Sequence, residues 1–177
     1  MSFRYTKLRK DRVYAVDKEK VSDLSSFKTL SKALFVFSML FTAMTYWHHA
    51  SWQGQWHQSF LGSAIGLALV VFGVWNLSQA FKDLASNYSP LFDAFLPKEI
   101  ISTGAYKKIR HPIYAYNLCV SFGLALSSGS YWVLASASIG AVFVLRSIFL
   151  EETYLRQHFP EYKGYQDKTQ RLIPYVF

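Results

Sequence analysis

The chain is poor in cysteine, in charged residues and in glycine-rich loops, and each shortage excludes a class of protein. Cys119 has no second cysteine to pair with, so disulfides and cysteine-rich metal sites are excluded. No glycine-rich phosphate loop and no Ser-His-Asp spacing occurs, which leaves phosphoryl transfer and hydrolysis without support. Only 17% of the 177 residues are charged, whereas 51% are hydrophobic and 18% are aromatic. This composition is typical of one membrane-embedded domain.

The net charge of +8 comes from basic residues that crowd the segments between long apolar runs. This distribution favours a membrane protein surrounded by lipids over a nucleic-acid-binding protein. Residues 1–26 are basic but are followed by no short apolar region with a cleavage signal, so we expect no removable signal peptide. We interpret them as a cytoplasmic arm.

Four apolar runs are long enough to be spanning helices, and they lie near residues 27–47, 60–81, 112–128 and 131–150. Lysine and arginine occupy the arm, the 82–111 connection and the 151–177 tail, whereas the 48–58 and 127–130 loops have neither. The positive-inside rule then places both termini in the cytoplasm. The sequence therefore predicts an all-α integral membrane bundle, multi-pass and single-domain, with a cytosolic C-terminal segment.

Two features of the first half have alternative interpretations. His48, His49 and His57 could suggest a metal, but no carboxylate or cysteine accompanies them, and tryptophans nearby favour an interfacial aromatic belt. We expect no metal site. Gly62 and Gly66, with Gly73 further along, place small residues on one helix face, which is either a groove for a lipid or a packing seam.

The segment ISTGAYKKIRHPIYAY, residues 101–116, combines a glycine turn, a basic cluster and a helix start. Pro112 suits the first position of a helix, and His111 before it is expected to be an extended capping residue. Lys107, Lys108 and Arg110 stand beside this helix start, so the local field should favour an anionic group of a ligand. The alternative is a loop whose charges only fix the membrane orientation.

The inner end of the last apolar run carries Arg146 and the adjacent acids Glu151 and Glu152. Ionisable groups near hydrocarbon usually pair or have a function, although Arg146 could simply extend to the interface. Neighbours on a helix point about 100° apart. One glutamate can therefore face a ligand while the other pairs with a lysine or arginine.

Taken in order, these residues resemble those of the integral-membrane methyltransferases, which include isoprenylcysteine carboxyl methyltransferases and phospholipid N-methyltransferases. The resemblance covers roughly the C-terminal half, from residue 87 onward. The residues that carry it are Thr103-Gly104-Ala105-Tyr106, Arg110-His111-Pro112-Ile113-Tyr114, the Glu151-Glu152 pair with Leu155 and Phe159, Tyr162, Tyr165 and Ile173-Pro174.

This resemblance implies transfer of a methyl group from S-adenosylmethionine to a lipophilic acceptor at the cytosolic membrane face. It also implies which residues hold this cofactor. They are Tyr106, His111, Pro112, Tyr114 and Glu151 or Glu152, with the backbone of Glu99, Ile100 and Ile101 as a weaker candidate. If the acceptor is a carboxylate, Arg146 is the residue expected to orient it, because a guanidinium forks onto two oxygens.

The sequence also departs from the family pattern and leaves other functions open. Tyr116 stands where glycine is common, and a side chain there is expected to fill space near the site. The acceptor could be an isoprenylcysteine carboxylate or a phospholipid amine. Alternatives from other classes are a membrane sterol or lipid reductase that uses NADPH and a non-catalytic lipid-binding protein.

Overall fold

The computed structural model describes residues 59–84 and 99–176, with seven separate helical positions between 29 and 43. The predicted arm at 1–26 lies outside the described residues, as do His48, His49 and His57. The predicted span near 27–47 is described only at those seven positions.

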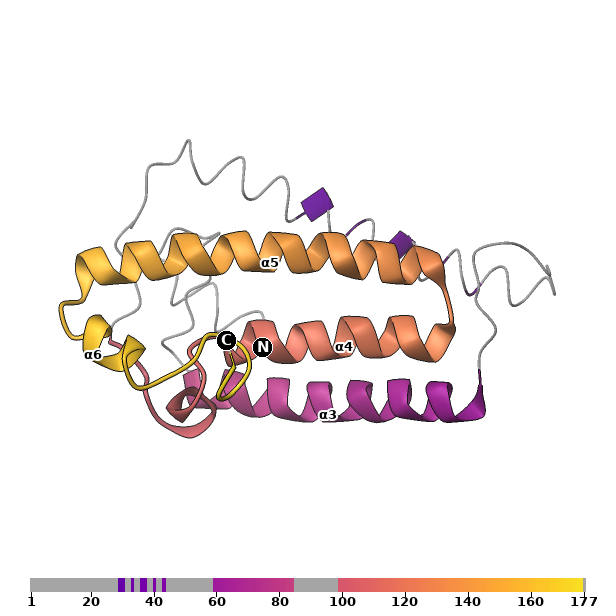
Figure 1. The fold of residues 1–177 in the computed structure, drawn as a ribbon, viewed down its shortest axis with the longest axis horizontal. Coiled ribbons are helices and arrows are strands. Elements are labelled where there is room, and N and C mark those ends of the chain that lie inside the picture. The colour runs from indigo at the N-terminus through magenta and orange to yellow at the C-terminus, as the bar shows by residue number, and fades with distance from the viewer. Residues whose placement is uncertain are drawn as a thin grey trace, which may run out of the picture.

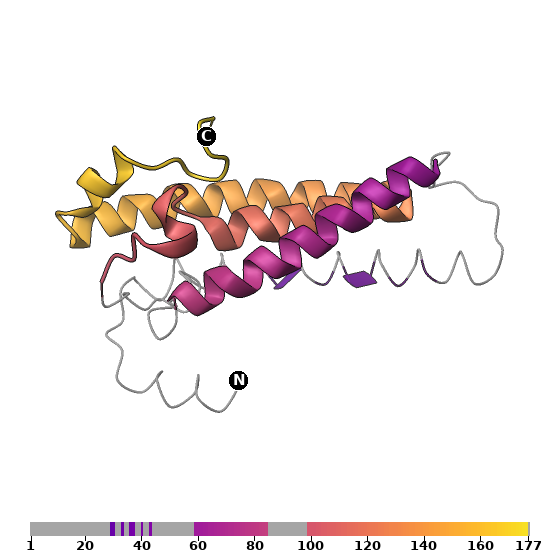
Figure 2. The same cartoon turned by 90° about the horizontal axis from the view of Figure 1, so that it is seen from below.

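Three long helices run side by side, and the short elements gather at one end of them (Figure 1). Helix α4 (Pro112–Ser128) lies between α3 (Phe60–Leu84) and α5 (Tyr131–His158). The 3-10 turn η3 (Gly104–Lys107), helix α6 (Tyr162–Gln166) and the following residues lie at the same end. Figure 2 shows α3 crossing the α4–α5 pair obliquely. The described residues form no strand, only an isolated parallel bridge, and the predicted helical class is confirmed for this part of the chain.

The α4–α5 hairpin follows from its capping residues. Pro112 opens α4, and Gly129 ends it in the left-handed region with φ 63°, where its N–H donates to the Ala125 carbonyl at 3.1 Å. The Ser130 hydroxyl then accepts from the Val133 N–H and caps α5. Ser128, Gly129 and Ser130 therefore form a tight turn between the two helices.

Helices α3 and α5 extend beyond the predicted spans, to Leu84 instead of 81 and to His158 instead of 150. The prediction stopped where the apolar run stops, but polar helix-forming residues continue α5 for two more turns. A helix of 28 residues is about 42 Å long, which exceeds a hydrocarbon core of about 30 Å. The end of α5 that carries both glutamates therefore extends past the apolar part.

Helices α3 and α5 are long and apolar enough to cross a membrane. The apolar side chains of α3 are largely exposed, with Leu67, Val71 and Trp75 at 60%, 63% and 67%, as expected for a helix that faces lipid. Helix α4 has 17 residues and would be about 26 Å long. The four-span count and the orientation of the termini stay predictions.

Two of the three glycines of α3 form a packing seam with α4. A Cβ at Gly66 would lie 2.5 Å from the Ser127 nitrogen and 2.8 Å from the Gly123 oxygen, so these two backbones touch. A Cβ at Gly73 would lie 3.0 Å from a backbone oxygen of α4. Gly62 is not part of this contact, since a Cβ there would meet only a serine hydroxyl of its own helix end at 3.3 Å. Of the two interpretations, the packing seam therefore describes Gly66 and Gly73.

Tyr116 lies on the α3 side of α4. Its ring meets Phe72 edge-on, with 6.0 Å between the ring centroids. Phe72 also lines a shallow apolar groove of about 600 Å³ along α3, with Leu67, Val71 and Trp75. Tyr116 thus packs against α3, and its predicted effect on the site stays a prediction.

Candidate functional site

The C-terminal segment pairs with the residues that precede α4. The Arg110 N–H donates to the Gln170 carbonyl at 2.7 Å, and the His111 N–H donates to the Arg171 carbonyl at 3.0 Å. In return the Gln170 N–H donates to the Lys108 carbonyl at 3.1 Å. These bonds form the parallel bridge between Ile109 and Gln170. They bring two segments about sixty residues apart in the sequence to the C-terminal end of α5.

Glu152 of α5 is buried at the centre of this junction, with a side chain 1% exposed. Its Oε1 accepts from Arg110 Nε at 2.8 Å, and its Oε2 accepts from Arg171 Nε at 3.1 Å. Arg110 Nη1 also donates to the carbonyls of Gln166, at 3.0 Å, and Thr169. A buried carboxylate is stable only when its charge is compensated, and here two guanidinium groups compensate it.

Of the three basic residues predicted to favour an anionic group, Arg110 is already paired within the protein, and the prediction for the cluster as a whole stays a prediction. The Arg110 guanidinium is 8% exposed and is occupied by Glu152 and by backbone carbonyls. A sequence window around Arg110 contains only cations, because Glu152 lies 42 residues away. Lys107 and Lys108 remain exposed.

Glu151 has a different environment from its neighbour. Its side chain is 23% exposed, yet its Oε2 is buried and has no hydrogen-bond partner. His111 stands between the two carboxylates, with Nδ1 3.8 Å from Glu151 Oε2 and Nε2 3.4 Å from Glu152 Oε1. The ring of Tyr114 stacks near that of His111, at 5.7 Å between centroids. Glu151 is thus a carboxylate close to a histidine but without an arginine partner among the ion pairs of the described residues.

Tyrosines connect α6 to the turn before α4. Tyr165 donates its hydroxyl to the Tyr106 carbonyl at 2.7 Å, and Tyr106 is itself buried. Tyr162 is 2% exposed, and its hydroxyl is buried without a hydrogen-bond partner. Burial, followed by the nearby charges of Glu152 and Glu151, raises the pKa of Tyr162 well above its ordinary value. Burial likewise raises the pKa of Tyr165.

Asp83 at the end of α3 fixes the η3 turn. Its Oδ2 accepts from the Ala105 N–H at 2.7 Å. Gly104 has φ 58°, and its missing Cβ leaves room for the Asp83 carboxylate, which would clash with a side chain at this position. A glycine suits this position because side chains rarely adopt positive φ. Asp83 therefore links the first described span to the turn that carries Tyr106.

The structure assembles some of the predicted site residues and leaves others apart. The structure brings together His111, Pro112, Tyr114, Glu151 and Glu152, and it connects Tyr106 to them through α6. Arg146 does not join this group, because its side chain is exposed and five residues separate it from Glu151, about 140° around α5. Its role toward an acceptor stays a prediction. Glu99 is exposed, and Ile100 and Ile101 are half-buried, on the stretch that leads into η3.

Three partners of this site were missed in the sequence: Asp83, Thr169 and Arg171. Each acts over a long sequence separation, so local patterns give no signal for Asp83 or Thr169. Arg171 precedes the Ile173-Pro174 pair by two residues, and this proximity could have identified it.

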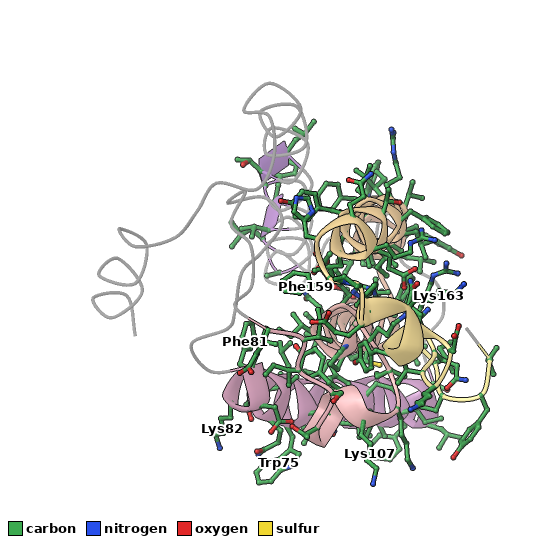
Figure 3. All side chains as sticks on the ribbon, turned by 90° about the vertical axis from the view of Figure 1, so that its left-hand side faces the viewer. Trp75, Phe81, Lys82, Lys107, Phe159 and Lys163 are labelled. Atoms are coloured by element: carbon green, nitrogen blue, oxygen red, sulfur yellow. The ribbon has the colours of Figure 1, made fainter. Side chains whose placement is uncertain are left out.

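Exposed lysines lie on the outer side of this end, together with exposed acids such as Glu161 and Asp167. Figure 3, which views the molecule from this end, shows Lys82 of α3, Lys107 of η3 and Lys163 of α6 pointing outward around the rim. All three are exposed. The charged groups that pair with one another are thus inside, whereas the lysines face the surroundings. Within residues 59–84 and 99–176, no cluster of three or more histidine, cysteine or acidic side chains could hold a metal ion.

Comparison with known proteins gives one family and several relatives. Residues 61–162 match the model of the phospholipid methyltransferase family. Phosphatidylethanolamine N-methyltransferase of Lodderomyces elongisporus is 33% identical over 89 residues, which are 48% of this chain and 10% of that protein. The enzyme of the same name from Candida albicans is 32% identical over 90 residues, or 49% of this chain and 10% of that protein.

A relative of another description is the nickel-cobalt-cadmium resistance protein NccN of Alcaligenes xylosoxydans xylosoxydans. It is 23% identical over 128 residues, which are 71% of this chain and 55% of that protein. The chain thus spans about a tenth of the length of the yeast relatives and about half of NccN. The family match includes α3, η3, α4 and α5, with both glutamates. By this match over more than half of its length, the chain belongs to the phospholipid methyltransferase family.

Proposed function

We propose that this protein transfers a methyl group from S-adenosylmethionine to the amine of a phospholipid at the end of the bundle where its charged residues meet. The family match and the yeast relatives, which are named as phosphatidylethanolamine N-methyltransferases, support the reaction and the kind of acceptor. The two exposed, apolar helices support a membrane setting for a lipid substrate.

The observation that carries the proposal is the unequal state of the two glutamates. Glu152 is compensated by Arg110 and Arg171, whereas the Oε2 of Glu151 is buried without a hydrogen-bond partner. His111 and Tyr114 support the Glu151 carboxylate more weakly than two arginines support Glu152. Its buried Oε2 is unfavourable unless a ligand supplies a cation or a hydrogen-bond donor. S-adenosylmethionine carries an ammonium group, a sulfonium and ribose hydroxyls, so this donor set fits Glu151.

Each residue then has a separate task. Glu151 binds a positive or donating group of the cofactor. His111 orients the Glu151 carboxylate, with 3.8 Å between His111 Nδ1 and Glu151 Oε2. Glu152 is a positioning residue, because its carboxylate is fully used in holding Arg110 and the C-terminal segment in place. Tyr106 and Tyr114 supply aromatic faces of the kind that stack on adenine or contact a sulfonium. Pro112 and the backbone of residues 99–101 remain candidates for contacts with the same ligand.

Bound S-adenosylmethionine would supply an electrophilic methyl group and would leave as S-adenosylhomocysteine, a chemistry that needs no metal and no covalent enzyme intermediate. The protein therefore has to align the acceptor amine and exclude water. The buried ion pairs around Glu152 provide a rigid wall for this purpose. Arg146 is exposed on another face of α5, so any contact it makes with an acceptor would come from the lipid side.

The test is methyl transfer in proteoliposomes with S-adenosylmethionine labelled in the methyl group. Label is expected in phosphatidylethanolamine and its methylated products. Label only in an added isoprenylcysteine analogue would assign a carboxylate acceptor instead. Binding of NADPH but not of S-adenosylmethionine would indicate a reductase, and binding of neither would indicate a non-catalytic lipid-binding protein.

A further inference from the structure

Unsatisfied polar atoms of the described residues are concentrated in one short stretch. Three buried side-chain oxygens have no hydrogen-bond partner there, and they belong to Glu151, Tyr154 and Tyr162. Leaving such an atom unpaired is unfavourable, and most buried polar groups in proteins are hydrogen-bonded. Glu151 and Tyr162 both lie at the charged cluster, and their two unpaired oxygens indicate a place that a ligand completes.

Tyr162 is the member of this set that the proposed function has not used. It is 2% exposed at the start of α6, and its ring lies 5.9 Å from that of Tyr165. Because burial and the charges of Glu152 and Glu151 raise the pKa of Tyr162, its hydroxyl stays protonated at neutral pH. Tyr162 is therefore a hydrogen-bond donor without an acceptor, near Glu151, whose Oε2 accepts no hydrogen bond.

The charges around Glu151 and Tyr162 restrict the kind of ligand that can bind between them. Arg110 and Arg171 are both bound to Glu152, so the remaining negative charge lies on Glu151. A ligand that satisfies Glu151 and Tyr162 together needs a positive donor next to an anionic acceptor. The amino acid end of S-adenosylmethionine, with its ammonium and carboxylate groups, has this arrangement.

We infer that Tyr162 is a further cofactor-binding residue, whose hydroxyl donates to the carboxylate of the cofactor's amino acid end while Glu151 accepts from the ammonium group. This inference rests on the proposed function. It assigns α6 a role in cofactor binding in addition to the Tyr165 contact that anchors it to Tyr106.

The experiment compares Tyr162→Phe with the wild-type protein, both full-length and in detergent. Binding of S-adenosylhomocysteine and of 5′-methylthioadenosine, which lacks the amino acid end, is measured by calorimetry. A lost hydrogen bond to a charged group is expected to weaken S-adenosylhomocysteine binding about tenfold or more. Binding of 5′-methylthioadenosine should not change. The melting temperature of the ligand-free variant should not fall, because the removed hydroxyl has no partner.

Two other tyrosines provide controls. Tyr165→Phe removes a hydroxyl that does donate to a carbonyl, so its ligand-free melting temperature is expected to fall. Tyr175→Phe alters a side chain that is 85% exposed and should change neither stability nor binding.

The outcomes separate the two proposals. If the wild-type protein binds neither S-adenosylmethionine nor S-adenosylhomocysteine, the proposed function fails, and the inference fails with it. If the wild type binds and Tyr162→Phe binds equally well, the inference alone is wrong. It is also wrong if both ligands weaken equally, or if Tyr162→Phe is destabilised as much as Tyr165→Phe.

Discussion

Replacing Glu152 by glutamine should detach the C-terminal segment, whereas the same change at Glu151 should not. Glu152 Oε1 and Oε2 accept from Arg110 and Arg171 at 2.8 and 3.1 Å. A glutamine retains one acceptor oxygen, but it presents an N–H to the second arginine and carries no charge. Both guanidinium groups would then lose the carboxylate that compensates them.

The size of the effect follows from the burial of each partner. Removing one member of a buried ion pair costs about 3–5 kcal/mol, and Arg110, which is 8% exposed, is close to that case. Arg171 is 29% exposed, so its pair contributes at most about 1 kcal/mol. Since glutamine keeps one hydrogen bond, about 3 kcal/mol is expected for the whole change. That is about a hundredfold increase in the detached population of the segment.

Limited proteolysis with trypsin measures this population. Lys168 lies between α6 and the paired residues, and cleavage after it requires local opening. Glu152→Gln should raise the initial cleavage rate about a hundredfold. Glu151→Gln should change it less than about threefold but weaken S-adenosylhomocysteine binding. Equal cleavage rates for the two variants would refute the assignment of different roles to the two glutamates.

Three further predictions concern the seam, the turn and the exposed arginine. Gly66→Ala should destabilise the protein by about 1–3 kcal/mol, because its Cβ would meet backbone atoms of α4. Gly140→Ala is the control, since a Cβ at Gly140 would have no atom within 4 Å. Equal melting temperatures for the two variants would contradict the packing seam. Gly104→Ala should lower the free energy of unfolding by about 1 kcal/mol, because alanine is strained at this positive φ. Hydrogen exchange of the Ala105 amide, which donates to Asp83, should accelerate. An unchanged exchange rate would contradict the role of Asp83 in fixing the η3 turn. Arg146→Gln should leave the melting temperature and S-adenosylhomocysteine affinity unchanged, and a tenfold weaker affinity would place Arg146 at the cofactor after all.

Helix boundaries could be predicted from the sequence where a residue has special backbone chemistry. Pro112 and the Ser128–Ser130 turn fixed both ends of α4, because proline suits a helix start and glycine suits a left-handed cap. The end of α5 could not be predicted in this way. Hydropathy detects the apolar run that ends at Leu150, but the hydrogen bonds of a helix continue through polar residues as far as His158.

The sequence predicted most of the residues that meet at the site, but only some of the ion pairs and hydrogen bonds between them. The 100° rule correctly predicted that one glutamate pairs with an arginine while its neighbour differs. It could not predict which glutamate pairs, or that two arginines share it, because Arg110 and Arg171 meet only after the chain has folded. The same limit explains why Asp83 was missed. Its partner is a backbone N–H 22 residues away, which leaves no pattern in the side chains.

The touching backbones at Gly66 and Gly123 restrict how a lipid substrate can arrive. No acyl chain can pass between α3 and α4 at that level, because the two helices leave no room even for a methyl group. If the acceptor is the proposed phospholipid, it must therefore approach from a different side. Widening the seam with larger side chains would loosen the bundle without opening an entrance, so engineering of acceptor range should begin elsewhere on the molecule.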